Sequence, residues 1–228
     1  MGVRLKMNGG LFMQKLKQEL KDKIILEAKN AFLEKGFDKA SMREIAKASG
    51  ITVGNVYRYF KNKDELFFAV VEDAHNAITN IIESDHSMNM NHLNDNFIVS
   101  ESDFKEYIDP ALNKIIDVFV SYKDEVTILV YKSQGSKLGM MIDEFKKVIV
   151  EKIYVQVLDG QDGSLLDLRG LAEVLAYASI EGITRVCRSD ASGEEIYRNI
   201  YSQMMFLFMG AKSRLQYIEQ RLEGELDE

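Results

Sequence analysis

The sequence is short of the residues that hold a secreted or metal-bound fold together. Among 228 residues there is one cysteine, Cys187, and there are three histidines. A single cysteine excludes an intrachain disulfide and a zinc site built from several cysteines, which fits the reducing cytoplasm. No apolar run approaches the roughly 20 residues that a transmembrane helix needs, and the N-terminal stretch is not apolar enough for a secretory signal. We therefore expect a cytoplasmic protein without membrane contacts.

Residues that interrupt helices are also scarce. There is one proline and no tryptophan, whereas Leu, Ile, Met, Lys and Glu, which favour helices, are abundant. The composition predicts an all-α chain, and the apolar periodicity divides it into about nine or ten helices. We expect a small domain over residues 13–62 and a larger helical domain over 63–228, preceded by an extension without fixed structure over residues 1–12.

Sequence motifs of enzymes are missing. There is no GxSxG or HExxH motif and no glycine-rich phosphate loop, and the spacing of His75, His86 and His92 fits no recognised set of metal ligands. Cys187 lies in an apolar helical stretch, which favours an inert core thiol over a nucleophile. The sequence thus predicts no enzymatic activity, no cofactor and no metal site.

The charge is divided unevenly along the chain. The net charge is −7, but residues 1–66 hold 14 Lys/Arg and 8 Asp/Glu, whereas residues 67–228 hold 15 and 28. The two parts therefore carry +6 and −13. Because salt screens charges beyond about 8–10 Å, a local basic surface attracts phosphates even on an acidic protein.

The basic part contains the pattern of two short helices joined by a tight turn, within residues 41–66. Ser41 and Glu44 form a capping box at the first helix. Gly50 supplies the positive φ angle that a sharp break requires, and Thr52 is placed to cap a second short helix. This arrangement is typical of a helix-turn-helix whose second helix enters the DNA major groove.

This stretch resembles the tetracycline-repressor (TetR) family of bacterial transcription regulators. The matching residues are Ser41, Arg43, Ile45, Ala46, Gly50, Ile51, Thr52, Gly54, Val56, Tyr57, Tyr59, Phe60, Asn62, Lys63, Asp64 and Leu66. The resemblance extends upstream to about Lys21 and so covers roughly the first third of the chain. It implies a three-helix DNA-binding domain followed by a helical ligand-binding and dimerisation domain. It also implies a repressor that binds a palindromic operator as a homodimer and is released by a small molecule.

The residues predicted to contact DNA are Ser41, Arg43, Thr52, Val53, Gly54, Asn55, Tyr57, Tyr59 and Lys63. Asn55 can form paired hydrogen bonds with adenine, and Val53 can touch a thymine methyl group. Arg43 can reach a guanine edge or a phosphate, and the resemblance supports a DNA contact for it. The tyrosine hydroxyls and Lys63 are better suited to phosphates. Packing of the two tyrosines against the first helix is the alternative.

The flanking segments are predicted from apolar periodicity and from caps. One amphipathic helix covers residues 15–35 and ends at Gly36, and a long helix covers 63–84. An asparagine-rich loop is expected over 85–96. Beyond it, two short helices are expected over 103–107 and 110–122, the second beginning at Pro110.

The last two predicted helices, over 165–188 and 194–222, are apolar around more of their circumference than one buried face requires. Helix pairing with a second copy as a four-helix bundle explains this pattern, and burial inside a monomer is the alternative. The residues predicted for dimerisation are Leu168, Leu175, Ala176, Ile196, Ile200, Met204, Leu207 and Phe208.

The middle of the chain supplies aromatic and methionine residues that suit an apolar pocket. The predicted ligand-binding residues are Phe104, Tyr107, Phe119, Tyr122, Tyr131, Met140, Met141, Phe145, Tyr177 and Glu181; ordinary core packing is the alternative for each. We expect a hydrophobic or aromatic inducer. Two other functions remain open, a helical protein-binding adaptor and a DNA-binding activator without a small-molecule inducer.

Overall fold

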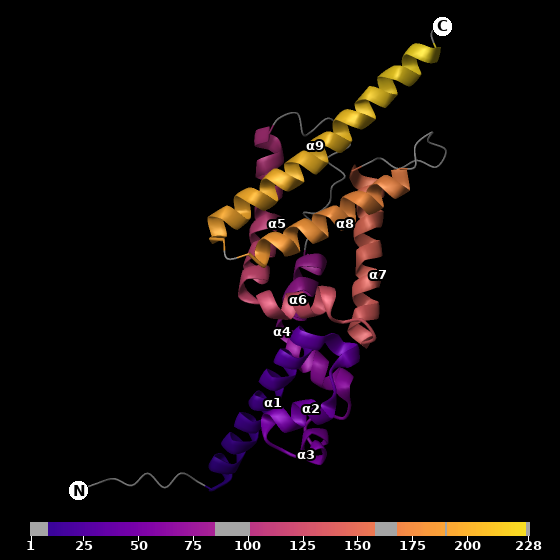
Figure 1. The fold of residues 1–228 in the computed structure, drawn as a ribbon. Helices are drawn as coiled ribbons and strands as arrows, with labels where there is room; N and C mark the ends of the chain where they lie inside the picture. The colour runs from indigo at the N-terminus through magenta and orange to yellow at the C-terminus, as the bar shows by residue number, and fades with distance from the viewer. Residues whose placement is uncertain (1–8, 85–100, 158–167, 190, 227–228) are drawn as a thin grey trace, which may run out of the picture. The chain divides into compact units, whose positions relative to one another are not determined.

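The computed structural model describes residues 9–84, 101–157, 168–189 and 191–226. Within these ranges all regular structure is helical, with nine α-helices and one π-helical turn, which confirms the all-α prediction (Figure 1). In the same ranges no helix is long and apolar enough to cross a membrane. The predicted loop over 85–96, with His86 and His92, lies outside the described residues.

The chain forms two compact units that are interleaved in sequence. Unit 1 comprises residues 1–72 and 124–140, and unit 2 comprises residues 73–123 and 141–228. Two helices, α4 (Lys63–Ser84) and α7 (Lys137–Lys152), therefore have residues in both units.

Unit 1 is built on α1 (Gly9–Lys39), α2 (Met42–Ser49), α3 (Val53–Tyr57), the first part of α4 and α6 (Lys123–Tyr131). At its centre three phenylalanines pack edge to face or stacked. The centroid of the Phe67 ring lies 5.0 Å from that of Phe32 and 5.2 Å from that of Phe37. The side chains of Ile24, Ala28, Ile45, Val56, Leu66 and Val71 are also buried in unit 1. These are the apolar positions that recur at helical spacing in the sequence.

Helix α1 begins earlier than predicted. It starts at Gly9 rather than near Lys15, and its exposed first turns contain local pairs such as Gln18 with Asp22, whose side chains lie 2.7 Å apart. The predicted break at Gly36 is confirmed by its non-helical φ of 77° and ψ of 168°. Only glycine adopts this conformation without strain, and it turns Phe37 onto Phe32.

Unit 2 consists of α5 (Glu101–Ser121), the rest of α4 and α7, the π-helical turn Ile153–Val157, α8 (Leu168–Cys187) and α9 (Gly193–Leu226). One core cluster joins α5, the end of α8 and the start of α9 through Leu112, Ile116, Cys187, Ile196 and Ile200. A second joins α7, the π-helical turn, α8 and the middle of α9 through Val150, Tyr154, Leu168, Ala172, Leu175, Ala176 and Ala211.

Helix α5 corrects the prediction of two short helices. It is continuous from Glu101 to Ser121, and Pro110 lies inside it. Proline removes one backbone hydrogen bond and strains the preceding turn. The burial of Leu112 and Ile116 in the first core cluster outweighs this local loss.

Candidate nucleic-acid interface

Helix α2 is set by caps at both ends. The Ser41 hydroxyl accepts a hydrogen bond from the Glu44 N–H (3.2 Å), and Gly50 ends the helix with a left-handed φ of 74°. Ser49, the last residue of α2, is buried. Its hydroxyl donates to the Ile45 carbonyl at 2.8 Å, so the buried oxygen is satisfied and the turn keeps its shape.

Helix α3 follows directly and is short. The Thr52 hydroxyl accepts from the Asn55 N–H (3.3 Å) and caps it, as predicted. Val56 and Phe60 are buried and fix its inner side. The outer side carries Gly54 and Tyr57, which are exposed, and Val53, Asn55 and Tyr59, which are half-buried.

The polar groups on this outer side are available. Tyr57 is 49% exposed, so it does not pack inward against α1. Within the described residues, no hydrogen bond or ion pair involves the side chains of Arg43, Asn55 or Tyr57. A half-buried amide already has restricted conformational freedom. It can therefore hydrogen-bond a base edge with little further loss of side-chain entropy.

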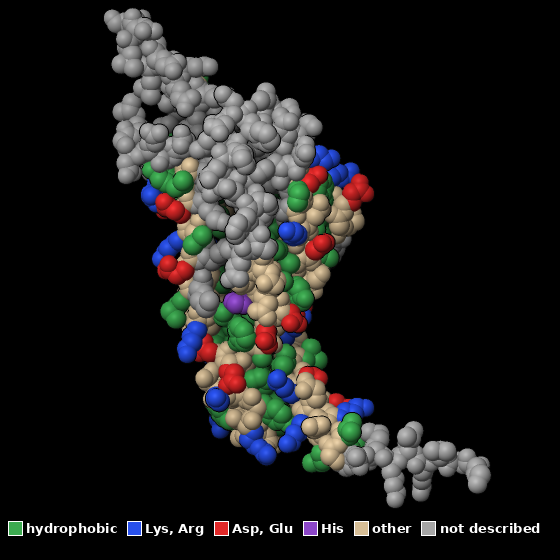
Figure 2. Space-filling model, turned by 180° about the vertical axis from the view of Figure 1, so that it is seen from behind, with side chains coloured by type: hydrophobic (Ala, Val, Ile, Leu, Met, Phe, Trp, Pro, Cys, Tyr) green, Lys and Arg blue, Asp and Glu red, His purple; other side chains and the backbone are tan. Residues whose placement is uncertain are grey.

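Basic side chains surround the two short helices. Arg43 and Lys47 are exposed on α2, and the Lys23 ammonium of α1 lies beside Gly50 at the turn. On the face drawn in Figure 2, Lys and Arg side chains gather at the lower end, which Figure 1 shows to be the end of unit 1 that carries α3. This placement agrees with the positive charge of residues 1–66.

Lys63 has a different environment from the other predicted DNA contacts. Its ammonium donates to the carbonyls of Phe37 (2.7 Å), Ala40 (3.2 Å) and Asp38 (3.4 Å). It also lies 4.2 Å from the centroid of the Phe37 ring. Lys63 therefore holds the C-terminal end of α1 against the first turn of α4.

The residues predicted for dimerisation lie mostly inside one chain. Leu168, Leu175, Ala176, Ile196 and Ile200 are buried in the two core clusters of unit 2, and Met204 and Leu207 pack against those clusters. The side chain of Phe208 is outside the described set. The inner faces of α8 and α9 thus account for much of the apolar pattern.

The outer faces of α8 and α9 carry other apolar residues. Val174 is 63% exposed and Phe206 is 79% exposed, and Tyr177 and Tyr217 are about half exposed. Phe206 and Tyr217 are about three helical turns apart and so share one face of α9. A groove of about 550 Å³ on this helix is lined by Tyr201, Ser202, Met205, Phe206, Met209 and Gly210.

The predicted ligand-binding residues are distributed over both units. Tyr131 and Met140 belong to unit 1 and are exposed; Tyr177 and Glu181 are exposed on α8 of unit 2. Phe119 packs against the first core cluster and Tyr122 is half-buried. The side chains of Phe104, Tyr107, Met141 and Phe145 are not among those described. None of them lines the groove formed by Tyr201, Met205 and Phe206 on α9.

Comparison with known proteins identifies the helix-turn-helix. Residues 24–70 match the family model described as bacterial regulatory proteins, tetR family. The chain is 24% identical over 149 residues to the HTH-type transcriptional regulator YfiR of Bacillus subtilis (strain 168), covering 61% of this chain and 70% of YfiR. It is 40% identical over 52 residues to the HTH-type transcriptional regulator QacR of Staphylococcus aureus (strain Mu50), covering 23% of this chain and 28% of QacR.

The fold has a counterpart among solved structures. A TetR-like transcriptional regulator from Rhodococcus sp. RHA1 superposes with a TM-score of 0.54 at 16% identity, covering 82% of this chain and 94% of that one. Several other curated relatives are matched over only a quarter to two fifths of their length. The family model spans the end of α1, α2, α3 and the start of α4, which are the elements that present Asn55 and Tyr57. Residues 24–70 thus match the DNA-binding region of the TetR family of bacterial regulatory proteins, and the rest of the chain shares the helical fold of a TetR-like regulator.

Proposed function

We propose that the protein is a transcriptional repressor that binds a palindromic operator as a homodimer and leaves it when a small hydrophobic molecule binds. The observation that carries this proposal is the outer side of α3. There a polar amide and a tyrosine hydroxyl stand without partners among the described residues, beside exposed basic groups. A rigid helix with this chemistry fits the major groove.

In this proposal the contacts divide between bases and phosphates. Asn55 reads adenine, Val53 touches a thymine methyl group, and Arg43 reads a guanine or holds a phosphate. Gly54 lets the backbone of α3 come close to the groove, and Tyr57 and Tyr59 position the helix through phosphates. The hydroxyls of Ser41 and Thr52 already cap their helices, and in this proposal both residues lie beside the DNA backbone.

The dimer is proposed to form through the outer faces of α8 and α9. Val174, Tyr177, Phe206 and Tyr217 give these faces large exposed apolar side chains. Gly210, beside Phe206 in the groove, has open space where a side chain would stand. A C2-related copy can bring its own Phe206 into that space, so that both grooves are filled by the same contact.

The inducer is proposed to bind unit 2 and to favour a dimer whose recognition helices are wrongly spaced. Unit 2 has half-buried methionine and aromatic residues, such as Met204, Met205 and Tyr201 around its first core cluster, and flexible methionines tolerate varied apolar ligands. Helix α4 begins in unit 1 and continues into unit 2. A rigid shift of this helix would carry the signal.

The experiment that tests the function is selection of bound sequences from random DNA duplexes by the full-length chain. The proposal expects enrichment of a palindrome whose half-sites lie about one DNA turn apart or slightly more. Selection without any enriched sequence would refute the proposal and favour a protein-binding adaptor. With the operator in hand, a screen for compounds that release the protein separates an inducible repressor from a regulator without an inducer.

A further inference from the structure

Residues 124–140 are packed onto the helix-turn-helix, although they are far from it in sequence. They form one compact unit with residues 1–72. The first contact is electrostatic. The Lys29 ammonium of α1 lies 3.1 Å from the Asp124 carboxylate and 2.8 Å from that of Glu125, in the first turn of α6. Burial lowers the pKa of Lys29, but the hydrogen bonds that its ammonium donates to both carboxylates outweigh this effect, and the pKa is raised.

A second contact joins the backbones. The Phe37 N–H, directly after the turn at Gly36, donates to the Lys132 carbonyl at the end of α6 (2.8 Å). A third is steric. Gly135 has a φ of 84°, and a Cβ atom there would lie 1.8 Å from the Asp38 Oδ1 atom. The turn after α6 therefore lies against the Asp38 side chain near the end of α1, and its positive φ favours glycine.

The fourth contact connects two helix N-termini. The Oδ1 atom of Asp64, in the first turn of α4, accepts a hydrogen bond from the N–H of Lys137, the first residue of α7 (2.9 Å). A carboxylate at this point is favoured by both helix dipoles. The bond is charge-assisted, so it is stronger than one between neutral groups.

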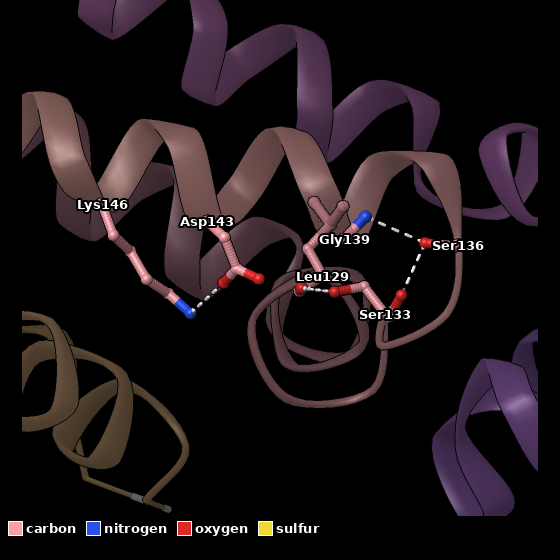
Figure 3. Close-up of polar contacts among 6 residues, drawn as sticks. All are labelled: Leu129, Ser133, Ser136, Gly139, Asp143 and Lys146. Carbon is pink, nitrogen blue, oxygen red and sulfur yellow. Dashed lines mark hydrogen bonds and ion pairs between the residues drawn. The ribbon is translucent and has the colours of Figure 1, made fainter.

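The turn that receives these contacts is itself rigid. Figure 3 shows the Ser133 hydroxyl donating to the Leu129 carbonyl (2.6 Å) and the Ser136 hydroxyl donating to the Ser133 carbonyl (2.6 Å). The Ser136 hydroxyl also accepts from the Gly139 N–H (2.9 Å) and caps α7. Both serines are buried. The turn therefore acts as a fixed support rather than as a loop that adapts to its neighbours.

We propose that residues 124–140 contribute to DNA binding as part of unit 1, although they do not touch DNA. We propose further that Asp64 and Lys29 are positioning residues for operator recognition. The inference rests on the proposed function and adds residues that do not touch DNA. Lys63 ties the first turn of α4 to α1, and the next residue, Asp64, ties the same turn to α7. Residues of α1, α2, α3 and α4 are all buried in unit 1, so in this proposal the angle between α1 and α4 sets the direction of α3.

This arrangement separates two kinds of binding. Specific readout needs α3 in one orientation, because paired base contacts have narrow geometry. Attraction to phosphates tolerates a spread of orientations. Loosening the tie at Asp64 should therefore lower affinity for the operator while leaving affinity for unrelated DNA unchanged. A residue that only stabilises the fold would change neither affinity, provided that the protein stays folded.

The test uses the full-length chain, Asp64→Ala, Asp64→Asn and the matched control Glu65→Gln. Glu65 is the neighbouring acid in the same helical turn, but its carboxylate accepts locally from the Lys61 N–H (2.7 Å) and does not reach α7. Affinity for the selected operator and for a scrambled duplex is measured at one salt concentration. Hydrogen exchange of the Lys137 amide is followed in parallel.

We expect Asp64→Ala to weaken operator binding by about tenfold, as for the loss of one charge-assisted hydrogen bond. Binding to the scrambled duplex should stay within about twofold, and the Lys137 amide should exchange faster. Asp64→Asn keeps an acceptor oxygen and should restore most of the discrimination. Glu65→Gln should behave as the wild type does.

The proposal is overturned if Asp64→Ala keeps the operator-to-scrambled ratio of the wild type, or if Glu65→Gln lowers that ratio equally. Gly135→Ala provides a second route, because its methyl group displaces Asp38; an unchanged ratio in a folded Gly135→Ala variant also counts against the proposal. If the wild type selects no operator, the proposed function fails. Hydrogen exchange of the backbone amides of α1 then tests the positioning role by itself. Equal protection of these amides in Asp64→Ala and Glu65→Gln would refute that role.

Discussion

Asn55 lies on the outer side of α3, and its half-buried side-chain amide forms no hydrogen bond with another described residue. Asn55→Ala should weaken operator binding by about 1–3 kcal/mol, the usual effect of losing a bidentate base contact. Folding should be unaffected, because the side chain has no partner to lose. Fluorescence anisotropy with the operator measures the effect. Asn30→Ala removes an exposed amide from α1 and is the control; equal affinities for the two variants would remove Asn55 from the readout.

Lys63 illustrates a role that is invisible in the sequence. Its carbonyl partners lie 23 to 26 residues upstream, so local spacing gives no sign of them. The caps at Ser41 and Thr52 and the turn at Gly50 could be predicted because each depends on residues within about one helical turn. The phosphate contact of Lys63 remains a prediction, and its bonds to α1 indicate a mainly structural role.

Lys63→Met should lower the free energy of unfolding by about 2 kcal/mol, since hydrogen bonds to a charged donor are lost. Urea denaturation measures this value. Lys61→Met removes the neighbouring exposed charge and should leave stability unchanged. A shallower salt dependence of DNA binding in Lys63→Met than in Lys61→Met, with unchanged stability, would instead support direct contact with phosphate.

At the level of helices, α8 and α9 approach each other where Gly182 faces Gln203. The Gln203 side-chain amide donates to the Ala178 carbonyl (2.8 Å), and a Cβ atom at position 182 would lie 1.9 Å from that amide. Gly182→Ala should therefore displace Gln203 and destabilise unit 2 by about 1–3 kcal/mol.

The double variant Gly182→Ala/Gln203→Ser tests this explanation. The shorter serine leaves room for the methyl group, so part of the lost stability should return, and thermal unfolding of the four proteins gives the coupling. Strictly additive effects of the two substitutions would show that the residues do not compete for the same space.

The N-terminal cap of α9 leads us to expect that the stability of the protein depends on pH. The Glu195 carboxylate accepts from the backbone N–H of Ser192 (2.9 Å) and from its hydroxyl (2.9 Å), and these bonds lower the pKa of Glu195. A carboxyl whose pKa is lowered by folding stabilises the protein above its unfolded pKa, about 4.3, and loses that contribution as the pH falls further. Glu195→Gln should flatten this part of the stability curve between about pH 5 and pH 3. An unchanged acid limb would contradict the capping role.

The sequence predicts α4, α8 and α9 to within a few residues, but it divides α5 into two helices for an identifiable reason. Pro110 suggested a helix start, whereas packing of Leu112 and Ile116 carries α5 through it. In α8 and α9, periodicity shows that each helix has two apolar faces. It does not show which of the two packs inside the chain and which is exposed. Phe206 is the most exposed large apolar residue of α8 and α9. It is not among the residues that the sequence predicts for dimerisation.

At the scale of the whole molecule, the outer faces of α8 and α9 predict self-association. Phe206→Glu should convert a dimer into a monomer, because it places a charge at the centre of the proposed apolar contact. Sedimentation velocity at micromolar concentration measures the change. Val148→Glu alters a half-exposed apolar residue on α7 and should leave the dimer intact. A monomeric wild type, or a dimeric Phe206→Glu variant, would refute this interface.

The composition of unit 1 could not be predicted from the sequence. Periodicity indicates a helix near residues 125–134, but its attachment to α1 and α4 depends on pairs such as Lys29 with Glu125 and Asp64 with Lys137, which are distant in the chain. Such pairs are fixed by the packing of buried faces, which a single sequence does not reveal.

The central claim is that two copies of α3, held by one dimer, read two half-sites of the same operator. The most direct measurement is the affinity of the full-length protein for the selected operator and for a duplex with about five extra base pairs between its half-sites. That insertion rotates one half-site by about half a turn. The account predicts that high-affinity binding is lost and that only the weaker affinity of a single half-site remains. Equal affinity for both duplexes would contradict it.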